Sequence, residues 1–289
     1  MIAQAGQRPP ARRRQVGALV AKVLSMIVLS AFTLVVVFPL LVIIFGSFKG
    51  TYDFAANPWG LPATFHFDNY VFAWSQAQIP RFFVNSVIVS GATVALTLAL
   101  SSCAAYAFST FRFRGGRALY VMFIVLLVVP VPINIIPLYV ILVRLHIVDT
   151  YLAVILPYTA GSLPLSVFLL RAFFDAIPHD LSDAARIDGC GHFTAFVRII
   201  LPISKPGLAT VTILTFLAAW NEFFLALVVL HNQSLFTLPL GLQTFSYQYR
   251  TDYTHLFAAL VLSIVPIIVV YAAMQRQFIA GLTAGAVRG

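Results

Sequence analysis

The chain has very little charge for its length. Of its 289 residues only 9% are Asp, Glu, Lys or Arg, while 61% are hydrophobic. Soluble domains carry about 25% charged residues, and a soluble fold of this size could not hide so much apolar surface. The composition therefore excludes a water-soluble protein and indicates one that crosses a membrane several times.

The residues and motifs of common catalytic sites are also scarce. Glu222 is the only glutamate, and the three lysines lie in no G-x-x-x-x-G-K-[ST] sequence, so the chain has no phosphate-binding P-loop and cannot hydrolyse ATP alone. G-x-S-x-G, H-E-x-x-H and C-x-x-C are absent, and the six histidines show no metal-ligand spacing. We therefore expect no catalytic residue, no metal site and no cofactor on this chain, and we do not expect it to be an enzyme by itself. The two cysteines, Cys103 and Cys190, fall in a predicted helix and a predicted inner loop and are not expected to form a disulfide.

Long uncharged runs predict the membrane-spanning segments, because a helix needs about 20 apolar residues to cross the hydrocarbon core. The fifth run starts after Lys205 and is interrupted only by Glu222. The other five runs are 23–48, 82–111, 118–143, 150–170 and 253–275. The sequence thus predicts an all-α polytopic membrane protein with six transmembrane helices.

The basic residues predict the orientation of these helices. With the N-terminus inside, the outer segments hold 4 of the 18 Lys and Arg residues (Lys49, Arg81, Arg144, Arg250) and the inner side holds the other 14. Because cytoplasmic loops are enriched in Lys and Arg, both termini are predicted inside. This distribution also explains the net charge of +9 without a nucleic-acid partner. Residues 1–20 are predicted to be a basic cytoplasmic tail, and 23–48 is too long a run for a typical signal peptide, so it is expected to be a retained span.

Two of the spans carry patterns that predict how they pack. In the second, small residues recur at every fourth position, at Gly91, Ala95, Ala99, Cys103 and Ala107, a spacing that lets another helix approach closely. In the third, Pro130, Pro132 and Pro137 flank Asn134, and proline kinks a helix. Broken backbone is tolerated in a membrane where it is buried in protein or lines a wet cavity, so this region either lines a transport path or is a structural bend.

The fifth span contains Trp220, Asn221 and Glu222, with Glu222 roughly 30 Å along a helix from Pro202. An acidic residue within a membrane is a functional candidate, and Trp and Asn beside it could stack on and hydrogen-bond a sugar. Alternatively, these polar groups satisfy neighbouring helices near the outer interface. Two outer connections also have distinctive content: Asp68-Asn69-Tyr70 predicts a helix start, and 231–255 combines aromatic with polar residues.

The large inner connection, 171–205, is polar and has helical spacing. Asp180 can cap a short helix with Asp183 at its third position, and Gly189 suits the left-handed conformation that ends it. A second short helix follows, whose apolar face is predicted to contain Phe193, Phe196, Val197 and Ile200, and Pro202 stops it. The pattern predicts either a docking site for a partner in water or an amphipathic connector on the membrane surface.

The residues of this connection resemble the EAA signature of ABC importer permeases. The matching residues are Asp183-Ala184-Ala185, Gly189, Ile199 and Leu201-Pro202, with Asp183 where the family usually has Glu. Trp220-Asn221-Glu222-Phe223 and the ending from Gly281 to Gly289 are similar to segments of the maltose-importer branch. The resemblance runs in order through residues 20–289.

The resemblance implies a type I ABC importer permease fold with N-in/C-in topology, in the cytoplasmic (inner) membrane of a bacterium or archaeon. It implies three kinds of protein partner: a second permease, so that a heterodimer is expected; two ATPase subunits, which bind ATP and Mg²⁺; and an extracytoplasmic solute-binding protein that contacts 231–255. Membrane lipid surrounds the chain. The residues implied in coupling to the ATPases are Asp183, Ala184, Ala185, Asp188, Gly189, Phe193, Phe196, Ile199, Leu201 and Pro202. Those implied in the tail that reaches the ATPases are Gly281, Thr283, Gly285 and Gly289, and the translocation-path candidates are Asn134, Trp220, Asn221 and Glu222.

The expected organisation is a tail (1–20), a six-helix domain (21–280) with its coupling loop at 176–203, and a C-terminal tail (281–289). The function implied is ATP-driven import of a di- or oligosaccharide, or of a related polyol or amino sugar.

Two other classes of membrane protein fit the sequence less well. An ion-driven carrier often shows repeat symmetry and mid-membrane charges, but no repeat is found and only Glu222 lies within a span. A membrane-embedded enzyme would need His, Asp or Glu clustered at one interface, and the acids near 175–188 lack that spacing.

Overall fold

The computed structural model describes residues 11–129, 131–178, 180–181, 187, 189–248 and 252–286, and these residues form helices without any strand. Four helices are long and apolar enough to cross a membrane, with candidate spans at Leu19–Gly46, Ile79–Thr110, Leu152–Phe174 and Tyr253–Arg276. They belong to α1 (Ala11–Gly46), α4 (Ile79–Thr110), α7 (Leu152–Phe174) and α14 (Tyr253–Ala286). These helices match the first, second, fourth and sixth predicted spans.

The fifth predicted span is bent and interrupted. A short helical segment is formed by α9 (His192–Ala195), the π-helical turn η2 (Phe196–Ile200) and α10 (Leu201–Ile203). It meets α11 (Lys205–Asn221) at an angle of 77°. Pro206 lies in the first turn of α11, where its missing N–H costs nothing. After a break at Glu222 the chain continues as α12 (Phe224–Val229). Counting the bent pair as one span brings the number of candidate spans to five.

The third predicted span is two separate apolar helices rather than one kinked helix. They are α5 (Gly116–Leu126) and α6 (Ile135–Arg144), with the 3₁₀ turn η1 (Val131–Asn134) before α6. Pro130 and Pro132 in the sequence cannot donate backbone hydrogen bonds, which explains why the helix does not run through. Six membrane crossings therefore stay a prediction.

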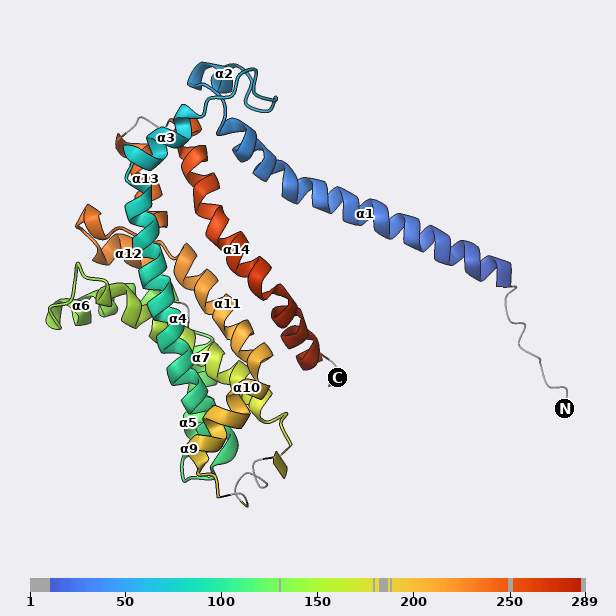
Figure 1. Cartoon of the computed structure of the whole chain (residues 1–289), viewed down its shortest axis with the longest axis vertical. Helices are drawn as coiled ribbons and strands as arrows, with labels where there is room; N and C mark the ends of the chain where they lie inside the picture. The colour runs from blue at the N-terminus through green and yellow to red at the C-terminus, as the bar shows by residue number, and fades with distance from the viewer. Residues whose placement is uncertain are drawn as a thin grey trace.

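The outer connections are short helices packed onto the long ones. Between α1 and α4 lie α2 (Thr51–Ala56) and α3 (Asp68–Ser75), so the helix start predicted at Asp68 is confirmed. Between α12 and α14 lie η3 (Gln233–Leu235) and α13 (Leu238–Gln248). Figure 1 shows α2, α3 and α13 gathered at one end of the bundle, with α9 and α10 toward the other. We call these the outer and inner ends, after the predicted topology.

The centre of the bundle is α4 packed against α7 and α11, with α14 on α11. The face of α4 that is buried carries hydroxyl groups, from Ser86, Ser90, Thr93, Thr97 and Ser101. The stripe of small residues predicted to pack is instead exposed from Gly91 to Cys103, and nothing lies within 4 Å of a Cβ built on Gly91. The close helix approach predicted there is not made within the described chain.

Helix α1 extends away from the other helices at a wide angle (Figure 1). Its residues are exposed from Leu19 to Leu41, and only its C-terminal end packs, near α14. A helix that is apolar on all sides must be covered by lipid or protein. The exposed length of α1 is therefore a surface that lipid or another polypeptide covers.

Gly241 gives a direct test of how α13 packs. A Cβ at this position would overlap the ring of Phe82 on α4, whereas one at Gly91 would meet nothing within 4 Å. We expect Gly241→Ala to lower the stability of the purified chain by about 1 to 3 kcal/mol, because crowding a packed interior strains it. The control Gly91→Ala should be neutral or stabilise by about 0.5 kcal/mol, because alanine favours helix. Thermal unfolding in detergent measures both, and equal midpoints for the two variants would contradict the packing.

Candidate functional site

Glu222 fills the break between α11 and α12. Helix α11 ends at Asn221 because the backbone at Glu222 is extended, with ψ of 132°. Its carboxylate then accepts hydrogen bonds from the first turn of α12, at 2.8 Å from the N–H of Leu225 and 3.3 Å from the N–H of Ala226. The side chain thus satisfies amides that the break would leave unpaired.

Tyr158 on α7 donates its hydroxyl proton to the same carboxylate, at Oε2 of Glu222. Tyr158 is buried, and it connects α7 to the α11–α12 break. Glu222 therefore accepts hydrogen bonds from three donors, which come from α7 and α12. Sequence reasoning named Glu222 but missed Tyr158, since nothing local distinguishes a tyrosine in an apolar span from its neighbours.

A cavity of about 180 Å³ lies beside this pair, between α6, α7 and α11. Its walls are mostly apolar, and it continues toward a second cavity of about 130 Å³ that shares Gly161, Ser162 and Ala218 with it. Ligand sites are usually about 300 to 1,000 Å³. In this conformation the cavity is therefore too small for an oligosaccharide. Together the two cavities extend along α7 and α11.

The other translocation-path candidates lie elsewhere. Trp220 is buried in the core, stacked on Phe216 at 5.3 Å between ring centroids and edge-on to Phe83 at 5.8 Å. Asn221 is exposed and donates to the carbonyl of Leu217 at 2.9 Å. Asn134 is exposed at the N-terminus of α6. Of the four, only Glu222 lines the cavity.

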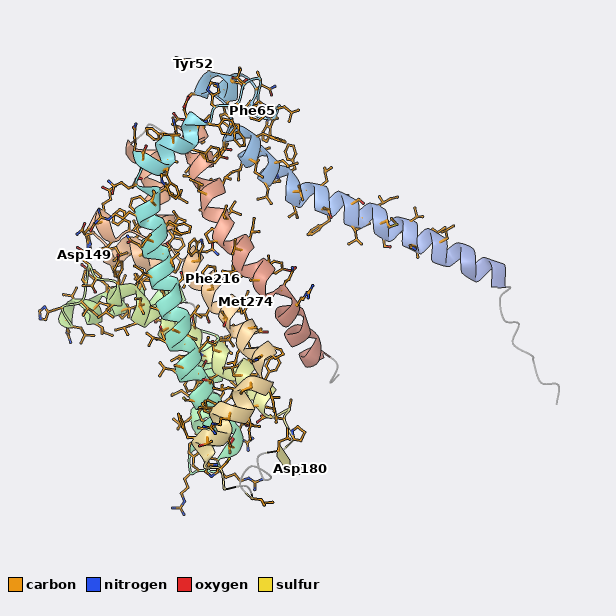
Figure 2. All side chains as sticks on the ribbon, viewed as in Figure 1. Tyr52, Phe65, Asp149, Asp180, Phe216 and Met274 are labelled. Atoms are coloured by element: carbon orange, nitrogen blue, oxygen red, sulfur yellow. The ribbon has the colours of Figure 1, made fainter. Side chains whose placement is uncertain are left out.

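The predicted coupling segment lies at the inner end, and Figure 2 shows Asp180 there, far from Tyr52 at the outer end. Gly189 has φ of +80°, the left-handed conformation predicted for it. Asp183, Ala184, Ala185 and Asp188 fall outside the described residues.

The second half of the segment is anchored to the bundle by aromatic packing. Phe196 is buried and stacks on Tyr106 of α4, with ring centroids 4.7 Å apart. The Tyr106 hydroxyl also donates to the carbonyl of His192 at 3.3 Å. The segment is therefore joined to α4 at one side and continues into α11 at the other.

The apolar face predicted for this helix is split in the structure. Phe196 and Ile200 are buried, but Phe193 is 75% exposed and Val197 43% exposed. Ile199 and Leu201 are half-buried, and Pro202 is exposed in the first turn of α10. Phe196 and Ile200 therefore face the bundle, and the docking role of the apolar face stays a prediction. The π-helical turn over Phe196–Ile200 shifts the register of the side chains that follow it.

The outer connection 231–255 is held firmly on the bundle. Asn85 of α4 donates to the carbonyls of Ser234 and Phe236, both at 2.9 Å, and Ser86 accepts from the N–H of Leu238 at 2.7 Å. Asp149 accepts from the N–H groups of His231 and Asn232 at 2.9 and 2.8 Å. The sequence has aromatic residues among polar ones here, and α13 buries one of the aromatic residues, Phe245, completely.

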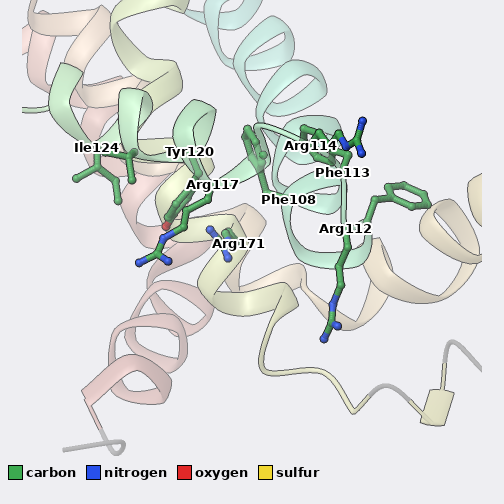
Figure 3. A pocket seen from close by; sticks show the side chains of 11 residues that line it. Phe108, Arg112, Phe113, Arg114, Arg117, Tyr120, Ile124 and Arg171 are labelled. Carbon is green, nitrogen blue, oxygen red and sulfur yellow. The ribbon is translucent and has the colours of Figure 1, made fainter.

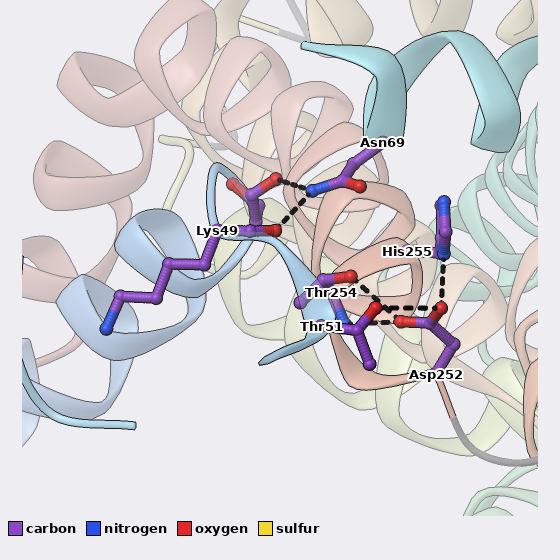
Figure 4. Close-up of polar contacts among 7 residues, drawn as sticks. Lys49, Thr51, Asn69, Asp252, Thr254 and His255 are labelled. Atoms are coloured by element: carbon purple, nitrogen blue, oxygen red, sulfur yellow. Dashed lines mark hydrogen bonds and ion pairs between the residues drawn. The ribbon is translucent and has the colours of Figure 1, made fainter. Parts of the chain in front are cut away.

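Figure 4 shows a second polar cluster at this end, where α14 begins. Asp252 accepts hydrogen bonds from Thr254 and pairs with His255 at 2.8 Å. Burial alone would raise the pKa of Asp252, but the hydrogen bonds from Thr254 and His255 outweigh it and lower that pKa. Asn69 nearby donates to the carbonyls of Ser47 and Lys49, at 2.8 and 2.9 Å, which fixes the turn after α1.

The remaining predicted site residues belong to the end of the chain. Gly281, Thr283 and Gly285 lie in α14, which is helical to Ala286, and Gly289 is outside the described residues. Among the residues that the structure describes, no group of three His, Cys, Asp or Glu side chains could hold a metal ion.

Comparison with known proteins identifies the family. A family model described as the inner membrane component of binding-protein-dependent transport systems matches residues 104–283, more than half of the chain. The chain belongs to this family. The match includes the coupling segment, the Glu222 break and nearly all of α14.

Individual family members align with this permease over most of its length. It is 35% identical to the diacetylchitobiose uptake system permease protein NgcG of Streptomyces coelicolor, with 92% of this chain and 88% of the relative covered. It is 38% identical to the arabinooligosaccharides transport system permease protein AraQ of Halalkalibacterium halodurans, with 88% and 92% covered.

The fold is shared with a solved importer. One chain of a bacterial ABC transporter involved in the import of the acidic polysaccharide alginate superposes with a TM-score of 0.80 at 23% identity, covering 94% of this chain and 100% of that one. The all-helical architecture of this permease is therefore that of an ABC importer subunit.

The contribution of Glu222 to stability can be tested by comparing it with the neighbouring residue Asn221. We expect Glu222→Ala to lower the stability of the purified permease by about 2 to 3 kcal/mol, because three donors at a broken helix lose their acceptor. Asn221→Ala, at an exposed position one residue away, should change it by less than about 0.5 kcal/mol. Thermal unfolding in detergent measures the difference. If both variants unfold with the wild-type midpoint, Glu222 does not hold the break.

Proposed function

We propose that this permease is the membrane-spanning subunit of an ABC importer that carries a sugar across the bacterial cytoplasmic membrane. The sugar would be a di- or oligosaccharide or a related polyol or amino sugar, delivered by a binding protein, with ATP hydrolysed on partner subunits. The observation that carries the proposal is the full-length similarity to permeases named for diacetylchitobiose and arabinooligosaccharide uptake. The topology proposed is six crossings with both termini inside.

The inner end supports coupling to separate ATPase subunits. Gly189, in the left-handed conformation, precedes a segment that contains Phe193. The apolar side chain of Phe193 is largely exposed on the chain alone, which suits contact with a partner. The segment continues through a 77° bend into α11, which ends at Glu222. At about 1.5 Å per residue, the 17 residues of α11 span about 25 Å. A displacement of the coupling segment would thus be transmitted by one helix to the cavity.

The outer end and α1 support the remaining partners. The connection 231–255 is pinned to α4 by side-chain hydrogen bonds, which gives a solute-binding protein a preformed surface to dock on. The exposed apolar length of α1 suits a second permease subunit beside this one. A related solved structure, a bacterial alginate ABC transporter in complex with an alginate pentasaccharide-bound periplasmic protein, supports such an assembly.

The translocation path is proposed to run past Glu222 and Tyr158, along the line of the two cavities. Because the cavity is narrow and largely apolar, we infer that the solute passes only when α6 and α11 separate, and that much of the sugar contact is made by the partner permease. Asn134 at the start of α6 would then face the widened path. The solute itself is set mainly by the binding protein.

Purification and reconstitution test this function. We expect tagged permease extracted from its native membrane to bring down two ABC ATPase subunits and a second permease. Vesicles containing that complex should take up a labelled oligosaccharide only with ATP at the ATPase side and loaded binding protein at the other. Uptake by this polypeptide alone, driven by an ion gradient, would contradict the proposal and favour a carrier.

A variant of the coupling segment makes the same assay specific. Gly189→Pro cannot adopt the left-handed conformation, so it should abolish ATP-driven uptake or ATPase association while membrane insertion stays normal. Gly115→Pro is the matched control, because Gly115 has φ of +82° in the other inner loop. Equal loss in the two variants, or no loss in Gly189→Pro, would count against coupling through this segment.

A further inference from the structure

A basic cavity lies where α4, α5 and α7 meet at the inner end, apart from the Glu222 cavity. One of its lining residues, Phe111, contacts the ring of His192 in the coupling segment, with centroids 5.0 Å apart. Its volume is about 770 Å³, and four arginines line it: Arg112, Arg114, Arg117 and Arg171 (Figure 3). Neither the packing of the bundle nor the proposed import mechanism uses this cavity.

The positive charge of the cavity is compensated only in small part. Among the described residues, the one carboxylate paired with any of these arginines is Asp175, 46% exposed, whose Oδ2 lies 3.3 Å from Nε of Arg171 without a hydrogen bond. The Arg171 guanidinium instead lies over the ring of Tyr120, 3.9 Å from its centroid. This contact orients the guanidinium and leaves most of its donors free.

The cavity lies at the depth where membrane spans end. The candidate spans Ile79–Thr110 and Leu152–Phe174 both finish beside it, and the three other arginines follow directly after Thr110. Helix α5 also begins at its rim, at Gly116, with the positive end of its dipole there. Cationic groups at this depth face the headgroup layer rather than the hydrocarbon or bulk water.

The rest of the lining is apolar and open to the side. Phe108, Phe111 and Phe113 form one wall, and Val121 and Ile124 of α5 form another, 47% and 37% exposed. A cavity with guanidinium groups at one part and exposed aliphatic side chains at another matches a ligand with an anionic head and an apolar tail.

We propose that this cavity binds an anionic phospholipid of the adjoining leaflet, with its phosphate between Arg117 and Arg171 and an acyl chain along Val121 and Ile124. Arginine suits phosphate because its planar donors bind two oxygens at once. Basic pockets between transmembrane helices are known to take such headgroups. A free phosphate would leave the aliphatic wall uncovered, so the lipid accounts for more of the site. This proposal depends only on membrane insertion and does not rest on the transported solute.

The test uses the full-length permease in lipid nanodiscs of phosphatidylcholine with and without phosphatidylglycerol. Retention of phosphatidylglycerol after extraction is measured by native mass spectrometry. Each guanidinium contributes about fivefold to affinity for an anionic headgroup, so the double variant Arg117→Gln, Arg171→Gln should bind roughly 25-fold more weakly. The matched control for either single variant is Arg276→Gln, which likewise removes one positive charge, from an exposed position at the end of the Tyr253–Arg276 span, outside the cavity. It should retain the lipid as the wild type does.

Two outcomes would overturn the proposal: wild-type retention by the double variant, or equal loss in Arg276→Gln, which would mark a general charge effect. If the double variant fails to fold, the wild type alone still decides. Its unfolding midpoint should rise on titration with phosphatidylglycerol and stay constant with phosphatidylcholine or inorganic phosphate. A rise with inorganic phosphate equal to that with phosphatidylglycerol would show a free-anion site instead.

Discussion

The structure depends on one constraint: inside a membrane, each backbone amide needs a partner within the protein. This chain interrupts a helix at Glu222, where it would otherwise leave amides of α12 unpaired. The carboxylate accepts from two of those amides, and Tyr158 from α7 donates to it. Glu222 is half-buried, and the hydrogen bonds that it accepts from α12 and α7 stabilise the break.

This arrangement explains how the two ends of the molecule are connected. Helix α11 runs from the bend above the coupling segment to the Glu222 break, and it packs on α4, α7 and α14 along the way. At the inner end Tyr106 and Phe196 attach the segment to α4, while at the outer end Asn85 attaches the last connection to the same helix. Helix α4 is thus the common support for the segments at both ends of the molecule, and α11 is the element that joins the inner segment to the Glu222 break.

Much of the fold could be predicted from the sequence, because membrane insertion constrains where charged and apolar residues occur along the chain. The uncharged runs located α4, α7 and α14 closely, and the left-handed Gly189 was predicted from its place after a helical pattern. The family signature gave the function class that the relatives support.

What could not be predicted depends on contacts between distant residues. The pairing of Tyr158 with Glu222 joins positions 64 residues apart, and no local pattern encodes it. The buried face of α4 within the chain carries Ser and Thr side chains, which are compact enough to pack, while the small-residue stripe is exposed. Helix α13 was missed because its apolar residues are interleaved with polar ones, and a backbone N–H at its start, that of Leu238, attaches it to Ser86 of α4.

The central claim is that Tyr158 and Glu222 act as a pair that holds the broken fifth span. A double-mutant cycle on the unfolding free energy of the purified permease, with Tyr158→Phe and Glu222→Ala singly and together, tests it most directly. The pair predicts a coupling energy of about 1 to 3 kcal/mol, because each change removes the same interaction. Additive effects, with a coupling energy near zero, would contradict it.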